Sequence, residues 1–245
     1  MQHQSTYGPR ARLGLIVPPT NTVNEAEWSR LIPDGVTFHT HRMALHTDSA
    51  TPDGAARLMA DLEAVFALLG QCGPDVIAYA CTAGSMVSPA ASLPDDLTRR
   101  TGRPAVTTAA AIIAALGALG IKELSVATPY ARALNDHEAH FLAGHGLKVA
   151  RLIGLGIGAN GPQEYPMIAR TPLDAVRDHA LAAFVPGSDA LLITCTDFPS
   201  LPLIRDLERD LGVPVISSNT ATLWAALRAA GIADDVPAGG ALFSR

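Results

Sequence analysis

The chain has 245 residues, of which 48% are hydrophobic and 17% are charged, and its formal net charge is −5 at pH 7. This composition predicts a compact globular protein and excludes a disordered chain. Basic residues form no stripe interleaved with aromatic residues, so nucleic acid is not expected as a partner. Residues 1–12 carry no signal-peptide core, and the most apolar run (109–121) is too short for a bilayer, so we expect a cytoplasmic protein with no membrane contact.

Short apolar runs alternate with segments of helical periodicity, and Gly or Pro residues mark many of their ends. An alternation of this kind is typical of an α/β protein with a mostly parallel sheet covered by helices on both faces. In chain order, the predicted elements are strand 13–17, helix 55–69, strand 75–80, helix 107–119, strand 124–128, helix 131–145, strand 147–153, helix 173–184, strand 190–194, helix 201–211, strand 213–217 and helix 221–230.

The second half of the chain repeats the first. The sequence Ala-Leu-Gly-Ala-Leu-Gly-Ile ends at Ile121, and the similar Ala-Leu-Arg-Ala-Ala-Gly-Ile ends at Ile232, which is an offset of 232 − 121 = 111. Two Cys-Thr pairs, which begin at Cys81 and Cys195, are separated by a similar offset of 195 − 81 = 114. We therefore expect two similar lobes, each a mostly parallel sheet flanked by helices, related by a pseudo-twofold axis.

The repeat also suggests how the chain is divided. We expect a polar tail at residues 1–12, a first lobe made of residues 13–120 together with roughly 213–245, and a second lobe made of residues 121–212. In this division the boundaries are approximate and the chain crosses between the lobes. The most useful consequence of this two-lobe division is that we expect the functional site at the junction of the lobes.

The two repeated cysteines are the strongest candidates for chemistry. Cys81 and Cys195 each follow a predicted strand, and in open α/β sheets ligands bind at the carboxyl ends of strands. A small or turn-forming sequence follows each cysteine and can turn backbone N–H groups toward a bound anion. The residues next to the two thiols are Thr82, Ala83, Thr196 and Asp197.

Pseudo-twofold symmetry would place the two thiols on opposite sides of one cleft. Such a pair suits removal of a proton from one face of a carbon and its return to the other, and it equally suits addition of a thiolate to an alkene. A single cysteine at the end of an apolar strand is usually only a core residue. The matched positions of Cys81 and Cys195 favour function, whereas Cys72 has no counterpart and is interpreted as structural. Three scattered cysteines form no disulfide framework.

The paired strand–Cys-Thr motifs, without a cofactor motif, resemble the aspartate/glutamate racemase superfamily. The segment Val17-Pro-Pro-Thr-Asn-Thr22 resembles the Pro-Ser-Ser-Asn-Thr segment of the maleate isomerases, with Asn21 in the substrate-binding position. Tyr130 in Thr-Pro-Tyr matches their active-site tyrosine, and Asn160 in Gly-Ala-Asn matches their second carboxylate-binding asparagine. The resemblance covers nearly the whole chain.

The resemblance implies a mechanism that needs no cofactor and no metal. Cys81 would add as a thiolate to an alkene carbon of maleate, and Cys195 would donate and accept the proton. Asn21, Tyr130 and Asn160 would hold the carboxylates of a small mono- or dicarboxylate substrate, and backbone amides after each cysteine would stabilise negative charge. The family resemblance also implies a homodimer.

Some features depart from the family or leave alternatives open. Pro19-Thr20 stands where the maleate isomerases have Ser-Ser. Arylmalonate decarboxylases have one catalytic cysteine, matching the second, and a glycine at the first position, so two cysteines argue against that activity. Racemases keep both cysteines, so a two-cysteine racemase of an amino acid or related 2-substituted acid stays an alternative. A non-catalytic module that binds small carboxylates is a third possibility.

Two other patterns are weaker. Residues 156–161 match Gly-x-Gly-x-x-Gly, but Pro162 and Pro166 interrupt the helix that a dinucleotide site would need. His39 and His41 share one face of a predicted strand, with His46 nearby, but no carboxylate or cysteine joins them at metal-ligand spacing.

Overall fold

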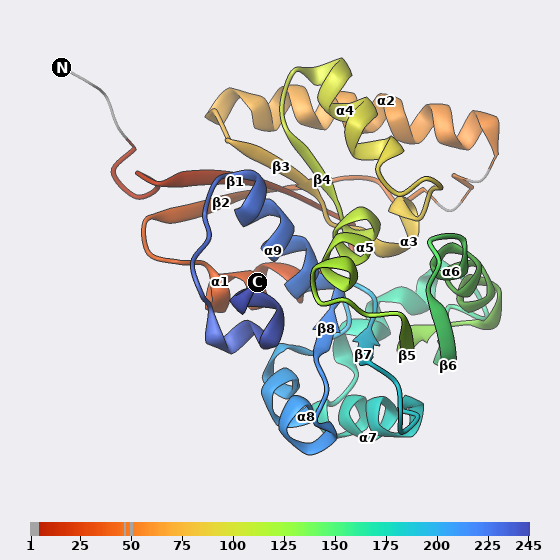
Figure 1. Cartoon of the computed structure of the whole chain (residues 1–245). Coiled ribbons are helices and arrows are strands. Elements are labelled where there is room, and N and C mark those ends of the chain that lie inside the picture. Colours follow the sequence, from red (N-terminus) through yellow and green to blue (C-terminus); the bar gives the residue numbers. More distant parts are fainter. Residues whose placement is uncertain (1–4, 47, 50) are drawn as a thin grey trace.

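The structure is a computed structural model that describes residues 5–46, 48–49 and 51–245. It contains two four-stranded sheets, of order β2-β1-β3-β4 and β6-β5-β7-β8 (Figure 1). Every neighbouring pair of strands is parallel. The strands are β1 (Ala11–Val17), β2 (Val36–Arg42), β3 (Val76–Tyr79), β4 (Ala105–Thr107), β5 (Glu123–Tyr130), β6 (Lys148–Ile157), β7 (Ala190–Ile193) and β8 (Val215–Ser217).

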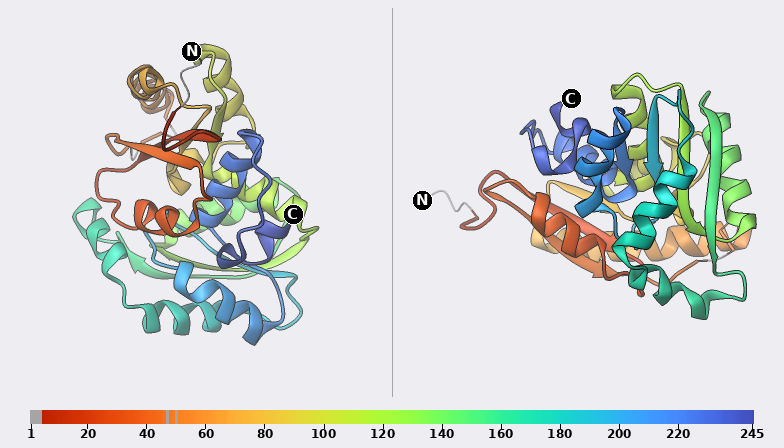
Figure 2. Two further views of the ribbon diagram at one scale, coloured as in Figure 1. Left: turned by 90° about the vertical axis from the view of Figure 1, so that its left-hand side faces the viewer. Right: turned by 90° about the horizontal axis from the view of Figure 1, so that it is seen from below.

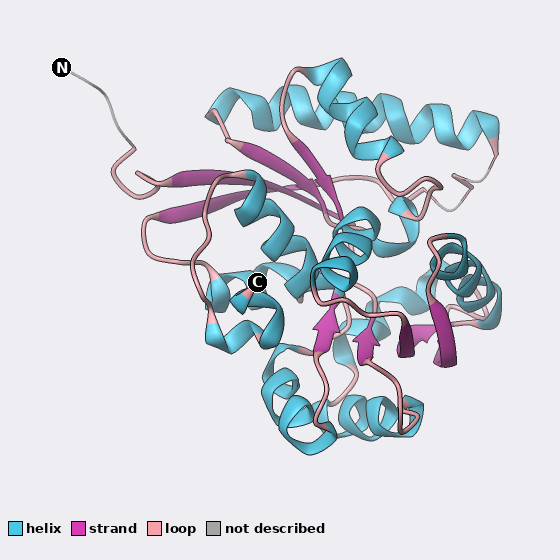
Figure 3. Ribbon diagram, viewed as in Figure 1, coloured by secondary structure: helices cyan, strands magenta, loops and turns pink. Residues whose placement is uncertain are grey.

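Helices follow the strands of each lobe in a similar order along the chain. Figure 3 shows these helices packed around the strands of the two sheets. The α-helices are α1 (Asn24–Leu31), α2 (Pro52–Leu69), α3 (Thr82–Ser85), α4 (Ser92–Thr101), α5 (Thr108–Ala118), α6 (Arg132–Gly144), α7 (Leu173–Ala183), α8 (Ile204–Leu211) and α9 (Ser218–Ala229). Short 3-10 helices cover Gly70–Cys72, Pro162–Arg170, Leu201–Leu203, Pro237–Gly239 and Ala241–Ser244.

Both sheets have the same strand order, with β1 corresponding to β5 and β3 to β7. This equivalence confirms the α/β fold with two similar lobes that the internal repeat predicted. Because the two halves run through the same sequence of elements, residues at equivalent positions of the repeat lie at equivalent positions of the two sheets.

The central strands are apolar throughout because both of their faces are covered. In β1, Leu13 and Leu15 point into a core shared with the second lobe, whereas Ile16 points into a core formed with α2 and α4. The second sheet is covered in the same way by α7 and α8 on its outer face. Figures 1 and 2 show α5 and α9 between the two sheets.

The predicted lobe boundary near residue 213 was wrong by one strand. β8 pairs with β7 and so belongs to the second sheet, because its backbone groups complete the hydrogen-bonding ladder there. Helix α9, which follows directly, packs against α5, α1 and β3 of the first lobe. We therefore propose that the second lobe extends to Ser217 and that the chain crosses back with α9. β1 begins at Ala11, inside the predicted tail.

Sequence patterns did not predict three helices, α1, α3 and α4. Helices α1 and α4 are strongly polar, and the apolar face of each is narrow. Helix α3 is only four residues long. Within the described part of the chain, no helix is both long and apolar enough to cross a membrane.

Candidate active site

The two cysteines occupy equivalent places at the carboxyl ends of central strands. Cys81 comes two residues after β3, and Cys195 comes two residues after β7. The thiol of Cys81 is buried, caps the short helix α3, and accepts a hydrogen bond from the backbone N–H of Gly84 at 3.4 Å. The fold therefore presents one thiol from each lobe at the edge where ligands bind in such sheets.

Cys195 has an unusual backbone conformation. Its φ is 87°, and it is the only non-glycine residue with positive φ among residues 5–46, 48–49 and 51–245. Its N–H donates to Oγ of Ser218 at 3.0 Å. A side chain held in the left-handed region is strained and persists where the surroundings fix it, which is common at functional sites.

Hydrogen bonds across the lobe junction join the two Cys-Thr segments. Thr196 Oγ1 donates to the carbonyl of Ala80 at 3.0 Å, although the two residues are 116 positions apart. Thr82 Oγ1 lies 2.9 Å from Ser218 Oγ, which also accepts from the N–H of Cys195. The segments around the two cysteines are thus one connected unit.

The two thiols and Tyr130 affect one another electrostatically. Burial raises the pKa of Cys195 to about 12, the N–H of Asp197 and the Tyr130 hydroxyl oppose this, and a charge on Cys81 raises it further. The pKa of Tyr130 is raised well above its usual value, first by burial and then by the charge of Cys195. Burial also raises the pKa of Cys81. The structure therefore brings Cys81, Cys195 and Tyr130 together.

Asn21 lies beside this group, but its amide is engaged within the protein. Its Nδ2 donates to Thr196 Oγ1 at 3.1 Å, and its Oδ1 accepts from the N–H groups of Val23 and Asn24 at the start of α1. The predicted positions Thr82 and Thr196 likewise use their hydroxyls to connect the loops. Ala83 is half-buried in the first turn of α3.

The structure does not bring Asn160 to the thiols. Asn160 is exposed, and its Nδ2 donates to Glu164 Oε1 at 2.6 Å. The other carboxylate oxygen of Glu164 accepts from the N–H of Gly158 at 2.8 Å, so Glu164 holds the turn closed on itself. Local turn chemistry explains this placement.

Asp197 brings a carboxyl group next to Cys195. It is 6% exposed; its Oδ1 accepts from the N–H of Thr22 at 2.8 Å, whereas its buried Oδ2 has no partner. Burial raises the pKa of Asp197 to about 6, and the N–H groups of Thr22 and Val23 oppose this. The equivalent position after Cys81 is Ala83, so the two thiols differ in their nearest charge.

A buried glutamate that sequence analysis missed supports the loop after Cys195. Glu27 on α1 is 3% exposed, and it accepts from the N–H groups of Ser200 and Leu201 at 2.7 and 2.8 Å. Its second oxygen accepts from Asn219 Nδ2 at 2.7 Å, and Asn219 also donates to the carbonyl of Thr196 at 3.2 Å. Glu27 thereby connects the first lobe to the second cysteine loop.

The repeat contained a signal for this residue. An offset of 138 − 27 = 111 relates Glu27 to Glu138 on α6, which is also buried. Glu138 has one hydrogen-bond donor, Thr194 Oγ1 at 3.1 Å, and burial raises its pKa to about 8. The two buried glutamates at matched positions therefore differ in their hydrogen bonds. Glu27 accepts from three donors, whereas Glu138 accepts from one, and its raised pKa keeps it mostly protonated at neutral pH.

Glu138→Gln is expected to remove a pH dependence of stability. Between the unfolded pKa of 4.5 and the folded pKa of about 8, the folded state holds a proton that the unfolded state has lost. The contribution of Glu138 to the free energy of unfolding therefore falls as pH rises, by at most about 1.4 kcal/mol per pH unit. Urea unfolding at pH 5, 6 and 7.5 should show the variant gaining stability relative to the parent as pH rises.

The control for this comparison is Asp136→Asn on the same helix, where the carboxylate is exposed and pairs with Arg132. Its stability relative to the parent should not show the same trend. A Glu138→Gln variant whose difference from the parent is equal at all three pH values would contradict the assignment.

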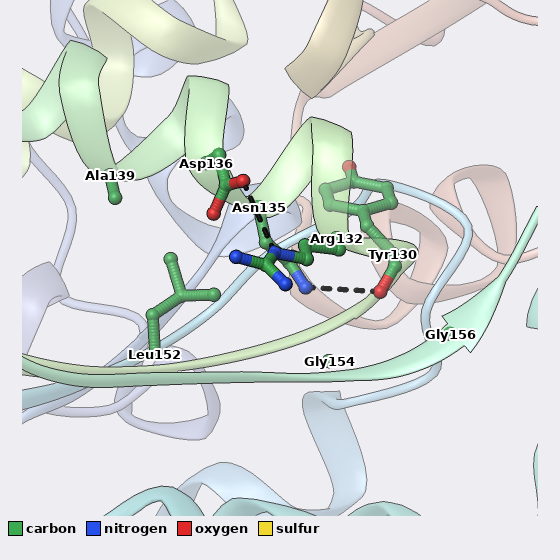
Figure 4. Close-up of a pocket in the computed structure, with 8 residues that line it drawn as sticks. All are labelled: Tyr130, Arg132, Asn135, Asp136, Ala139, Leu152, Gly154 and Gly156. Carbon is green, nitrogen blue, oxygen red and sulfur yellow. Dashed lines mark hydrogen bonds and ion pairs between the residues drawn. The ribbon is translucent and has the colours of Figure 1, made fainter. Parts of the chain in front are cut away.

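A cavity of about 380 Å³ lies between α6 and β6, and Tyr130 is one of the residues that line it (Figure 4). In it, Asn135 donates to the carbonyl of Tyr130, and Arg132 pairs with Asp136. Neither cysteine lines it.

Within residues 5–46, 48–49 and 51–245, no three His, Cys, Asp or Glu side chains are grouped to hold a metal ion. His39 contacts Thr37, and His46 pairs with Asp61.

Comparisons with known proteins identify the family of this chain. A family model described as arylmalonate decarboxylase matches residues 13–243. The chain is 30% identical to a maleate isomerase of Nocardia farcinica over 94% of each chain. It is 32% identical to an arylmalonate decarboxylase of Bordetella bronchiseptica, over 94% of this chain and 93% of that one.

Solved structures are similar over almost the whole chain. A maleate isomerase from Pseudomonas putida, solved as a cysteine-to-alanine mutant with maleate, superposes with a TM-score of 0.85 at 28% identity, covering 96% of this chain and 97% of that one. A cysteine-to-serine mutant of a Nocardia farcinica maleate cis-trans isomerase, with a covalently bound succinylcysteine intermediate, gives a TM-score of 0.83 at 28% identity over 95% and 98%. This chain is thus an enzyme of the arylmalonate decarboxylase and maleate isomerase family, within the aspartate/glutamate racemase superfamily.

Proposed function

We propose that this enzyme isomerises maleate, or a closely related small dicarboxylate, from cis to trans without a cofactor. The observation that carries the proposal is the pair of Cys-Thr segments, one from each lobe, joined by the Thr196–Ala80 hydrogen bond. This pairing suits a reaction that needs a nucleophile and a proton donor close to one small substrate.

In the proposed reaction, Cys81 forms a C–S bond to one alkene carbon. The π electrons move to the other carbon, which takes a proton from Cys195, and the alkene becomes a single C–C bond. After rotation about that bond, Cys195 takes the proton back, the double bond forms again, and the C–S bond breaks. Fumarate leaves, Cys81 is again a thiolate, and Cys195 is again a thiol.

The acid–base character of the site supports these roles. A pKa of about 12 keeps Cys195 protonated at neutral pH, as a donor must be. The charge of the nearby Asp197 carboxylate is one of the causes of this raised pKa, after burial. The succinylcysteine in the Nocardia farcinica isomerase is the adduct that addition of a cysteine to maleate would give.

Substrate binding by Asn21, Tyr130 and Asn160 remains part of the proposal, as does anion binding by the backbone amides of Thr82, Ala83, Thr196 and Asp197. Tyr130 has its hydroxyl at Cys195, which suits contact with a carboxylate there. Asn160 would first have to leave Glu164 and turn inward.

A proton NMR assay of the purified enzyme with maleate tests the proposal. We expect the alkene signal of maleate to be replaced by that of fumarate without added cofactor. Maleate that stays unchanged, while the folded protein is intact, would overturn the proposal.

The same protein distinguishes the alternatives. An arylmalonate decarboxylase would release CO₂ from phenylmalonate. A racemase would incorporate deuterium at the α-carbon of a 2-substituted acid in D₂O. A binding module would bind small carboxylates without turnover. We also propose a cytoplasmic homodimer, which cell fractionation and light scattering would test.

A further inference from the structure

A second tyrosine lies at the other thiol. Tyr79 is the last residue of β3, two positions before Cys81, so their side chains lie on the same side of the strand. Both belong to the apolar cluster that includes Ile16, Phe66 and Ile77, and Tyr79 is 3% exposed. The ring is therefore fixed by packing, and only its hydroxyl is available to a polar partner.

The hydroxyl of Tyr79 and the sulfur of Cys81 converge on Gly84. A Cβ atom placed on Gly84 would lie 2.4 Å from Tyr79 Oη and 3.1 Å from Cys81 Sγ. The first distance is a clash, so the close approach of these two groups requires glycine at this position. The same glycine donates its N–H to the sulfur.

Within residues 5–46, 48–49 and 51–245, no cation is among the groups that affect the charge of Cys81. The pKa of Cys81 is raised by burial and lowered by the N–H of Gly84 and by the Tyr79 hydroxyl. The other titratable groups that interact with Cys81 are Cys195 and Tyr130, and each disfavours a second charge nearby. A buried anion is costly unless hydrogen bonds stabilise it.

We propose that the Tyr79 hydroxyl donates to the sulfur of Cys81 and stabilises its thiolate, so that Cys81, which has no acidic neighbour like Asp197, is the reactive thiolate rather than Cys195. Each thiol then has its own tyrosine, Tyr79 for Cys81 and Tyr130 for Cys195. The two thiols differ in the residue two positions after each cysteine. This residue is neutral Ala83 in the first loop and acidic Asp197 in the second. The role of Tyr79 in turnover rests on the proposed isomerase function. The effect of Tyr79 on the reactivity of the Cys81 thiol does not depend on that function.

Alkylation by iodoacetamide measures that reactivity directly. In a Cys72→Ser background, peptide mass spectrometry would follow modification of Cys81 and Cys195 from pH 6 to pH 10. In the parent, Cys81 should react first. In Tyr79→Phe, the rate at Cys81 near pH 7 should fall about tenfold and its pH profile should move up by about one unit, as loss of one hydrogen bond to a charged group predicts.

Two further variants make the test decisive. Tyr7→Phe is the matched control, because Tyr7 is 83% exposed, and it should leave the profile unchanged. Gly84→Ala keeps both reacting groups but pushes the hydroxyl away, so it should reproduce the shift even if Tyr79→Phe folds poorly. Circular dichroism would confirm the fold of each.

The proposal is overturned if Cys195 reacts before Cys81 in the parent. It is also overturned if the Cys81 profile is unchanged in folded Tyr79→Phe or, should that variant not fold, in Gly84→Ala. Alkylation requires no turnover. If the enzyme leaves maleate unchanged but Tyr79→Phe still shifts the Cys81 alkylation profile, only the isomerase assignment is contradicted.

Discussion

Replacement of either Cys81 or Cys195 by alanine is expected to lower turnover of maleate by at least about a thousandfold. In the proposed reaction, Cys81→Ala removes the atom that would form the covalent bond. Cys195→Ala removes the group that would supply and recover the proton. Steady-state kinetics by NMR would measure both losses.

Mass spectrometry separates the two roles. After incubation with maleate, Cys195→Ser should accumulate an adduct of one maleate on Cys81, because addition is possible but return of the proton is slowed. Cys81→Ala should form no adduct. Cys72→Ala is the control, since Cys72 is exposed and has no counterpart in the second lobe, and it should keep full activity. Substantial activity in either active-site variant would contradict the two-thiol mechanism.

Glu27→Ala is expected to lower the free energy of unfolding by roughly 3 kcal/mol or more. The substitution leaves three buried donors, on Ser200, Leu201 and Asn219, without their acceptor. Each unsatisfied buried group costs about 1–3 kcal/mol. Urea unfolding followed by circular dichroism would measure the loss. Activity should fall as well, because Asn219, which donates to the carbonyl of Thr196, loses its bond to Glu27.

Glu25→Ala is the matched control on the same helix. Glu25 is half-buried and pairs with Arg42 at 2.6 Å near the surface, where such a pair contributes about 0.2–1 kcal/mol. The stability loss of Glu27→Gln should lie between those of Glu27→Ala and Glu25→Ala, since its amide oxygen can still accept from the loop N–H groups. If Glu27→Ala is no less stable than Glu25→Ala, Glu27 does not hold the loop.

The repeat made much of this molecule predictable. An offset near 111 residues indicated two lobes of equivalent elements, and it singled out Cys81 and Cys195 over Cys72. Short apolar runs are typical of buried parallel strands, and this pattern predicted the central strands of the sheets. Each of these inferences rests on patterns that are local or that repeat along the chain.

What the sequence could not predict depends on contacts between distant residues. The bond from Glu27 to Asn219 joins residues 192 positions apart, and no local pattern specifies it. Asn160 matched a family segment, yet the nearby Glu164 captures its amide. The last strand was assigned to the first lobe although Pro214-Val-Ile-Ser-Ser repeats Pro104-Ala-Val-Thr-Thr at an offset of 214 − 104 = 110, because the boundary was drawn before this strand and the chain crosses back only with α9.

The bonds that cross between the Cys81 and Cys195 segments have a consequence for any half-length version of this protein. A fragment made of one repeat would retain only one of the two matched cysteines, Cys81 or Cys195, and would lose the Ala80 carbonyl or the Thr196 hydroxyl that joins their segments. Neither repeat by itself would be expected to catalyse the proposed reaction, because each supplies the scaffold that holds the other's cysteine segment.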